Sequence, residues 1–410
     1  MLKAVKVKIY PNKDQEIIFA KLFGCYRKVY NLCLSHKMET YENSKTSLGL
    51  KELGYYYHNI LTKSDDFFYL NEHNTKVLKQ SIINMLAAYK NFFESLNGTR
   101  KGDNVGFPKF RSKYDDQSAR FPIDAISKRF FSEDFNKINI TKQIKNLKFR
   151  CSDADKKYLI KYKDNIKSLT IKKSKAGTYT ASILVDGSPI NEFRKNAKDY
   201  ENVNNKIIGI DLGIKSYYVS YDGENRTELE NPKFLRSKEH KLKRLQRKLS
   251  RLDNKNKELN NTKETIYSNN RNKLRKRLAK QYEKITRSRE TFLHQETSKL
   301  INENQVIVIE DLNIKGMIKN HKLAKSIQEL CLGKFKQLLL YKAEWYNRKI
   351  VMVDRFYPSS KLCSCCGYKK VDLTLKDRTY KCPECGLVID RDYNASINIR
   401  QEGIRILTTQ

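Results

Sequence analysis

Five of the nine cysteines in this 410-residue chain crowd into the stretch from residue 363 to residue 385, and four of them are regularly spaced. Cys363 and Cys366, then fifteen residues, then Cys382 and Cys385 form a Cys-x2-Cys-x15-Cys-x2-Cys pattern. Two such pairs supply the four thiolates of a tetrahedral zinc ribbon. Because four thiolates leave no coordination position for water, the pattern predicts a structural zinc ion.

The cysteines outside this pattern do not suggest disulfides. Cys365 is left over between two ligands, and we expect it to point away from the metal. Gly367 and Gly386 follow the two pairs and permit the tight turns that a zinc knuckle needs. The other cysteines are scattered along the chain, which argues against a disulfide framework: Cys25, Cys33, Cys151 and Cys331.

Acidic residues stand at the ends of two predicted strands and at the start of a predicted helix. The apolar run in "IIGIDLG" reaches Asp211, and the run "VIVIE" reaches Glu310. A carboxylate beside apolar neighbours is costly unless a cation meets it. With an acidic helix start at 390–392, this order indicates a ribonuclease H-like nuclease, in which converging carboxylates hold two divalent ions for phosphodiester cleavage.

We expect different roles for the two aspartates at that helix start. Asp390 follows the cysteine-rich segment directly and suits an N-cap, whose side chain accepts a backbone N–H of the first turn. Asp392 lies inside the first turn and is expected to be the third metal ligand. The small residues Asn394, Ala395 and Ser396 would let the helix approach the strands. The alternative for Asp392 is a favourable charge near a helix N-terminus.

Two other interpretations of the acidic strands remain open at this point. "IGIDLG" also resembles the first phosphate loop of the actin and sugar-kinase ATPases, but those proteins need further glycine-rich turns. This chain has 16 glycines, none arranged as GG or GxGxxG. Alternatively, Asp211 and Glu310 simply end their strands without binding anything.

The charge balance favours a polyanionic partner. Lys and Arg total 82 against 46 Asp and Glu, a formal charge of +36, and nucleic acid relieves the self-repulsion of such a chain. An anionic membrane surface is the competing partner, yet no run approaches the roughly 18 apolar residues of a spanning helix. The N-terminus also lacks an apolar signal core. We expect a cytoplasmic protein that associates with the nucleoid when bound to DNA.

The N-terminal half of the sequence changes pattern along its length. "AVKVKIY" alternates like a strand and stops at Pro11, and helical patterns follow to about residue 100. "SLTIKKSKAGTYTASILVDG" is typical of a hairpin turned at 175–177, within a small β domain that the first strand joins. The clearest helix covers 74–96, where apolar residues recur at helical spacing: Leu78, Ile82, Met85, Tyr89, Phe93 and Leu96.

Residues 234–302 are helical in pattern and strongly basic. Two apolar stripes predict an antiparallel helix pair with Lys and Arg on its outer faces. Such faces are often merely solvated, but acids are nearly absent from "KEHKLKRLQRKLSRL" and "RNKLRKRLAK", which favours a wall that contacts nucleic acid. The stripes are Leu242, Leu245, Leu249 and Leu252, and Leu274, Leu278, Tyr282 and Ile285.

Several motifs together carry a family resemblance: "YPNKDQEIIFAKLFGCYRKVYNLCL", "GFPKFRSK", "IGIDLGIK", "VIEDLNIKGM", "RFYPSSKLCSCCG" and "YKCPECGLVIDRDYNASINI". They resemble TnpB, an insertion-sequence-encoded nuclease family related to the miniature type V CRISPR effectors. The likeness runs to about residue 400. One departure is Ser396, where the family more often has alanine.

The resemblance implies a multidomain α+β / α/β fold. A wedge β-barrel-like domain is interrupted by a helical recognition module, and an RNase H-like (RuvC) domain carries a zinc-ribbon insert. In this sequence the implied parts are the first wedge strand (1–10), the helical module (11–105), the wedge domain (106–205), the RuvC domain with its basic hairpin (206–358), the ribbon that binds target nucleic acid (359–389) and the RuvC helix and tail (390–410).

The resemblance also implies an activity. It is RNA-guided cleavage of both strands of double-stranded DNA beside a short flanking motif, with a guide RNA from the transposon end. Asp211, Glu310 and Asp392 fall on the catalytic triad, with Mg²⁺ or substituting Mn²⁺ as its metal. The expected particle is a monomeric ribonucleoprotein. Lys76 and Gln80, one helical turn apart, match positions that read the flanking motif, and both residue types suit base edges in the major groove.

Two functions from other classes stay open. One is a guided DNA-binding regulator that does not cut, and the other is a RuvC-like nuclease that needs no guide. Because all three carboxylates are present, nothing in the sequence indicates an inactivated relative. Guide RNA sequence, flanking motif and cleavage positions do not follow from the sequence, nor does the choice between a transposon nuclease and a CRISPR-associated effector.

Overall fold

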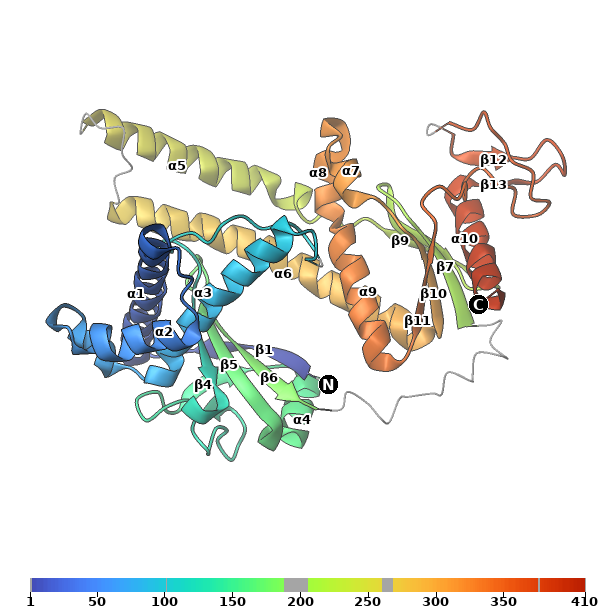
Figure 1. The fold of residues 1–410 in the computed structure, drawn as a ribbon. Coiled ribbons are helices and arrows are strands. Elements are labelled where there is room, and N and C mark those ends of the chain that lie inside the picture. The colour runs from blue at the N-terminus through green and yellow to red at the C-terminus, as the bar shows by residue number, and fades with distance from the viewer. Residues whose placement is uncertain (1, 101, 188–205, 260–267, 375–376, 410) are drawn as a thin grey trace. The chain divides into compact units, whose positions relative to one another are not determined.

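The computed structural model describes residues 2–100, 102–187, 206–259, 268–374 and 377–409, and divides the chain into two compact units (Figure 1). Unit 1 comprises residues 1–188 and unit 2 residues 189–410. Each unit has its own sheet and its own hydrophobic core. Among the described helices, none is both long and apolar enough to cross a membrane.

Unit 1 is built on a six-stranded antiparallel sheet in the order β2-β5-β6-β1-β4-β3. The N-terminal strand joins it between β6 and β4, as its alternating pattern predicted, with Val5, Val7 and Ile9 buried. The predicted hairpin is confirmed, and Gly177 supplies its left-handed turn residue with φ of 82°. The strands are β1 (Leu2–Tyr10), β2 (Gln117–Pro122), β3 (Lys137–Ile138), β4 (Leu147–Arg150), β5 (Ile166–Lys173) and β6 (Tyr179–Asp186).

The helices of unit 1 share one core with its sheet. They are α1 (Lys13–Ser44), α2 (Leu50–Tyr55), α3 (Thr75–Leu96) and α4 (Asp153–Lys161). The predicted helix is confirmed as α3, and its apolar stripe is buried as far as Tyr89, whereas Phe93 and Leu96 are 53% and 65% exposed. The cluster that covers α3 ends at Tyr89, so the helix continues past the core that buries it.

Unit 2 contains a five-stranded sheet in the order β11-β10-β7-β8-β9. β7, β8 and β9 form an antiparallel meander, whereas β10 and β11 run parallel to β7. This mixture of three antiparallel and two parallel strands is the RNase H-like sheet that the sequence predicted. The strands are β7 (Ile207–Leu212), β8 (Ser216–Tyr221), β9 (Arg226–Glu230), β10 (Val306–Glu310) and β11 (Lys349–Val353).

Helices cover both faces of this sheet. α6 (Asn269–Glu303) and α9 (Leu332–Tyr346) share a core with Ile208, Ile210, Ile307 and Ile309. The alternate residues Ile207, Val306 and Val308 pack instead with Ile399 of α10 (Arg391–Thr408). Because side chains alternate across a strand, each apolar strand is buried on both faces. The short helices α7 (Ile314–Ile318) and α8 (His321–Leu330) complete the unit.

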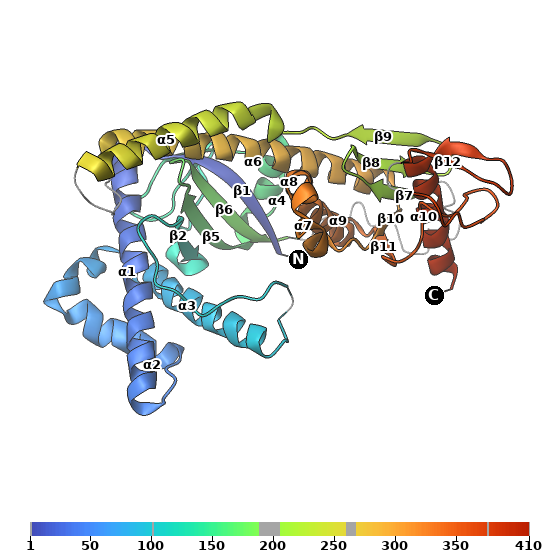
Figure 2. The same ribbon diagram turned by 90° about the horizontal axis from the view of Figure 1, so that it is seen from above.

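The predicted basic helix pair is confirmed as α5 (Glu239–Leu259) beside α6, which Figure 2 shows lying side by side. Gln246 donates to the Tyr282 hydroxyl at 2.7 Å, and Arg271 pairs with Asp253. The second contact lies closer to the C-terminus of α5 and closer to the N-terminus of α6 than the first, so the two helices are antiparallel. Their exposed positions include a run of cations on α5: Lys241, Lys243, Arg244, Arg247, Lys248 and Arg251.

The segment between β11 and α10 contains the cysteine-rich region, including the two-stranded ribbon of β12 (Thr379–Lys381) and β13 (Val388–Asp390). It has a small core of its own, formed by Leu373 and Tyr380 with two of the cysteines. The predicted fold class is therefore confirmed: an antiparallel β domain with helices, followed by an RNase H-like domain that carries a ribbon insert.

Candidate active site and zinc centre

Asp211 and Glu310 lie at the same edge of the unit 2 sheet. β7 and β10 are parallel and in register at Ile210 and Ile309, so the two acids follow at equivalent positions. Since Ile210 and Ile309 face α6 and α9, the next residues point to the opposite face, where α10 packs. Sheet register therefore directs both carboxylates toward the N-terminal end of α10.

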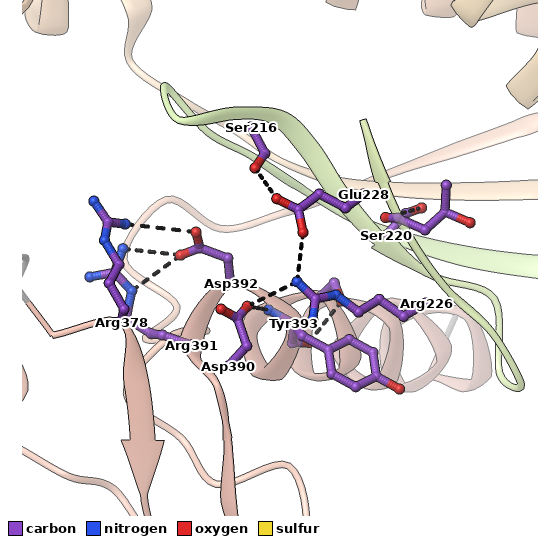
Figure 3. A network of polar contacts seen from close by, with 11 residues as sticks. Ser216, Ser220, Arg226, Glu228, Arg378, Asp390, Arg391, Asp392 and Tyr393 are labelled. Carbon is purple, nitrogen blue, oxygen red and sulfur yellow. Dashed lines mark hydrogen bonds and ion pairs between the residues drawn. The ribbon is translucent and has the colours of Figure 1, made fainter. Parts of the chain in front are cut away.

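The start of α10 separates the two aspartates as predicted (Figure 3). Asp390 is the N-cap, and its Oδ1 accepts the N–H of Tyr393 at 2.9 Å. Arg226 of β9 lies 3.5 Å from the same oxygen. Asp392, inside the first turn, pairs with the guanidinium groups of Arg391 at 3.0 Å and Arg378 at 3.8 Å. The N-cap prediction for Asp390 is confirmed.

The carboxyl group of Asp211 is buried close to other acidic side chains. Burial raises the pKa of Asp211 well above its usual range, and the charges of Glu310 and Asp392 raise it further, while Arg391 acts in the opposite direction. Burial also raises the pKa of Glu310, partly offset by a hydrogen bond from Ser359. Carboxylates that are buried close together favour binding of a cation, and a ligand set made only of carboxylate oxygens suits a hard divalent ion.

The carboxylates are not drawn into a tight cluster. Among the residues that the structure describes, only the four cysteines bring three or more ligand atoms within 4.8 Å of one another. Two ions about 4 Å apart would need ligands spread more widely than one ion does.

Close packing of α10 on β7 and β10 brings its first turn to the sheet edge. A methyl group added at Gly209 of β7 would overlap the Ser396 carbonyl oxygen and come within 2.6 Å of the Arg400 nitrogen. Ala395 and Ser396 are fully buried against the sheet, as expected from their small size. Gly209 was not identified from the sequence, although it lies two residues before Asp211 in the quoted strand.

The four cysteines that the sequence predicts to bind zinc are brought together. Their four Sγ atoms lie within 4.8 Å of one another, at 3.6 Å for Cys363 and Cys385 and 3.5 Å for Cys366 and Cys382. A tetrahedron with zinc–sulfur bonds of about 2.3 Å separates its sulfurs by about 3.8 Å. This arrangement fits zinc without rearrangement of the backbone, and the leftover Cys365 is exposed.

Glycines shape both knuckles in the same way. Gly367 and Gly386 have φ of 77° and 74°, in the left-handed region that glycine adopts without strain. Their N–H groups donate to the carbonyl oxygens of Cys363 and Cys382 at 2.9 and 3.2 Å. The two turns are therefore formed by local backbone geometry, as the sequence predicted.

Lys76 and Gln80 lie one turn apart at the start of α3, in unit 1. The Lys76 ammonium pairs with Asp124 at 2.8 Å and both side chains are more than half exposed, whereas Gln80 is half-buried. An exposed ion pair of this kind is weak and exchangeable. Contact of these two residues with DNA stays a prediction.

Other residues around the site were not found from the sequence. Arg378 lies in the ribbon, fourteen positions before Asp392, and Ser359 lies far from its partner Glu310, so no local pattern connects them. Asn394 was taken only as a small residue, yet its amide is fully buried and hydrogen-bonded, like that of Asn398 one turn later. Two amides spaced by four along a helix share one face, a signal that the sequence did contain.

Three family models match this chain. The model described as "Probable transposase" matches residues 192–321, the one described as "Cas12f1-like, TNB domain" matches 333–399, and a "Helix-turn-helix domain" matches 1–46. The second match contains all four cysteines, Asp392 and the first half of the helix on which Asp392 lies. The matches thus fall on the sheet, the ribbon and the first strand and helix of the chain.

Relatives that align over nearly the whole chain support the same family resemblance. A protein of Streptomyces pristinaespiralis named "Putative RNA-guided DNA endonuclease" is 30% identical over 98% of this chain and 89% of its own length. InsQ of Escherichia coli K12, named in the same way, is 22% identical over 99% and 93%. The fold resembles Cas12f1 in its complex with single-guide RNA and target DNA, at 17% identity and a TM-score of 0.52 over 94% of this chain and 83% of that one. The chain belongs to the TnpB family.

Proposed function

We propose that this protein is an RNA-guided DNA endonuclease that cleaves both strands in one RuvC site. One observation carries the proposal: Asp211, Glu310 and Asp392 come from two parallel strands and a helix start, and burial together with the charges of Glu310 and Asp392 raises the pKa of Asp211. The nuclease class agrees with the names of its full-length relatives. The implied substrate is double-stranded DNA beside a short flanking motif, paired to a guide RNA from the transposon end.

The three carboxylates would hold two Mg²⁺ ions, or Mn²⁺ in their place. When bound, the ions supply activation of the attacking water and stabilisation of charge on the leaving oxygen. Asp211 lies near the end of the central strand β7, and Glu310 is oriented by the Ser359 hydroxyl at 2.5 Å. While no metal ion is bound, Arg391 and Arg378 neutralise Asp392. Once a metal ion binds Asp392, the two guanidinium groups can hold a phosphate of the DNA.

The rest of the molecule supports binding of two nucleic acids. The formal charge of +36 and the exposed cations of α5 suit a phosphate backbone. Lys76 and Gln80 are the proposed contacts with the flanking motif, and the ribbon is the proposed contact with target nucleic acid. The ribbon's zinc has a structural role only. We propose a monomeric, cytoplasmic particle that joins the nucleoid on its DNA target.

The test begins with the RNA that co-purifies with the full-length protein. Sequencing it should return one abundant, discrete species, and the complex should cut DNA that matches that species when Mg²⁺ is present. EDTA should stop cutting without releasing the RNA. Cutting by RNA-free protein would indicate a guide-independent nuclease, and guided binding without cutting at any Mg²⁺ or Mn²⁺ concentration would indicate a regulator.

A second measurement tests the basic helices. Affinity for the RNA should fall steeply as salt rises, because each neutralised phosphate releases counterions. Replacing Arg244 and Lys248 of α5 with Gln should make the slope shallower by about one to two, since each contact contributes close to one. An unchanged slope would mean that these cations face solvent.

A further inference from the structure

A buried serine links the segment before the first zinc ligand to the metal-site carboxylate. Ser359 lies between β11 and Cys363 and is buried, and its hydroxyl donates to Glu310 Oε1 at 2.5 Å. Its own carbonyl oxygen accepts the Asn398 side-chain N–H at 2.7 Å. The serine therefore bridges β10, which carries Glu310, and α10, which carries Asp392.

The two buried asparagines of α10 fix the whole segment from residue 359 to residue 364. Asn398 donates to the Leu362 carbonyl oxygen at 2.8 Å, and Asn394 donates to the same oxygen at 2.6 Å. Asn394 also accepts the N–H of Ser364, next to the ligand Cys363, at 3.0 Å. With both amides committed to the backbone, the position of Ser359 is set by the helix beneath it.

Glu310 and the next residue, Asp311, accept hydrogen bonds from different kinds of donor. Asp311 is held by the ammonium of Lys336 at 2.6 Å and the guanidinium of Arg355 at 3.0 Å, one cation on each oxygen. Its charge is thus already neutralised. Glu310 accepts from a neutral hydroxyl on Oε1, which orients the carboxylate but leaves its negative charge uncompensated. A hydrogen bond from a neutral donor thus orients the carboxylate and leaves its charge available to a metal ion.

We propose that Ser359 is a positioning residue for divalent-ion binding by Glu310, and that Asn398 fixes its orientation from α10. The inference rests on the proposed function, because it concerns the same carboxylate site. The hydroxyl holds one oxygen of Glu310, so that the carboxylate meets the cation in one orientation. Partners of metal-binding carboxylates that do not touch the metal commonly change metal affinity about 10- to 100-fold.

The experiment measures Mn²⁺ binding to the full-length, zinc-loaded protein by the paramagnetic resonance signal of the free ion. Glu310→Gln gives the background from other sites. Above that background, Ser359→Ala should bind Mn²⁺ about 10-fold more weakly than the unsubstituted protein. Ser360→Ala is the matched control: its side chain takes part in none of these contacts, and its affinity should not change. Asn398→Ala should weaken binding in the same direction while zinc content stays at one per chain.

A pair of equal-shape variants separates orientation from packing. Ser359→Thr keeps the hydroxyl and Ser359→Val replaces it with a methyl group, so any disturbance from added bulk is common to both. The Thr variant should bind Mn²⁺ about 10-fold more tightly than the Val variant, even if Ser359→Ala proves unstable. Equal affinity of Thr and Val variants would overturn the inference. If the unsubstituted protein binds no Mn²⁺ above the Glu310→Gln background, the proposed metal site fails as well.

Discussion

The zinc ribbon and the carboxylate site lie in the same unit but are assembled in opposite ways. The thiolates come from two short turns within 23 residues, and backbone N–H groups of the knuckles hold them within 4.8 Å of one another. Asp211, Glu310 and Asp392 come from two strands and a helix start, and their oxygens do not reach that spacing. Local turns preassemble one site, whereas the whole tertiary fold positions the other.

This difference suits the role that we propose for each metal. A preassembled four-thiolate site binds tightly, and its binding energy becomes folding energy. Buried carboxylates that repel one another destabilise the folded protein unless cations lie beside them, and here Arg391 and Arg378 form ion pairs with Asp392. Loss of zinc should therefore damage the fold, and loss of a carboxylate should abolish the chemistry without unfolding the protein.

The sharpest test of this contrast compares the two aspartates that begin α10. Asp392→Ala should abolish cleavage of both DNA strands, because it removes a metal ligand while the fold stays intact. Asp390→Ala should still cut, but should lose about 1 kcal/mol of stability with its N-cap. Cleavage of a guided target in Mg²⁺ and thermal unfolding measure the two effects.

RNA and DNA binding should remain unchanged in both aspartate variants, as gel-shift titration would show. Full cutting by Asp392→Ala, or loss of cutting only in Asp390→Ala, would place the active site on the wrong residue.

Replacement of a thiolate should break the fold instead. Cys382→Ser should lower zinc content from one per chain and cost the solubility or folding of the C-terminal part, because structural zinc supplies folding free energy. The matched control is Cys365→Ser, which changes an exposed cysteine in the other knuckle and should keep its zinc. Metal analysis of the purified variants decides: unchanged zinc in Cys382→Ser contradicts the assignment.

The approach of α10 to the sheet offers an intermediate test. Gly209→Ala should cost about 1–3 kcal/mol, since the added methyl group overlaps the backbone of α10 and pushes the first turn away from the sheet. Cleavage should fall as well, because Asp392 moves with the helix. Gly24→Ala is the control, in α1, where an added methyl group meets no atom within 4 Å and should stabilise the helix by up to about 1 kcal/mol.

Denaturant unfolding measures both glycine variants. Equal stability of Gly209→Ala and the unsubstituted protein would contradict this prediction, because it would mean that α10 moves away from the sheet at no cost in stability.

The sequence predicted those parts of the sites that depend on local pattern. Cysteine spacing identified the ribbon, apolar runs identified the strands that carry Asp211 and Glu310, and position in the first turn distinguished Asp390 from Asp392. Each of these signals is contained in a few consecutive residues. The same holds for the basic helix pair, whose apolar spacing predicted two helices that contact each other, as at Gln246 and Tyr282.

What the sequence did not predict depends on contacts between distant segments. Ser359 touches Glu310 across 49 residues, and Arg378 reaches Asp392 from the ribbon. The exposure of Phe93 was missed for a similar reason: periodicity continues along α3 after the core that buries the helix has ended. Local pattern gives the type of each element, and only the packed neighbours decide what its side chains meet.

The smallest expected effect concerns the stability cost of the carboxylate site without divalent ions. Burial and the charges of Glu310 and Asp392 raise the folded-state pKa of Asp211, so the stability this group contributes is complete below its unfolded pKa and is lost as pH rises through the folded pKa. Asp211→Asn, neutral at every pH, should therefore melt at a higher temperature than the unsubstituted protein at pH 7 in buffer without added Mg²⁺, and the gain should shrink toward pH 4.

Asp311→Asn is the control of opposite sign: Lys336 and Arg355 lower the pKa of Asp311, so its contribution is present above the unfolded pKa and its loss should lower the melting temperature at pH 7. Adding Mg²⁺ should narrow the advantage of Asp211→Asn, because only the intact site gains stability from the ion. A lower melting temperature for Asp211→Asn without Mg²⁺ would mean that the carboxylates are already compensated, and the contrast with the preassembled zinc site would fail.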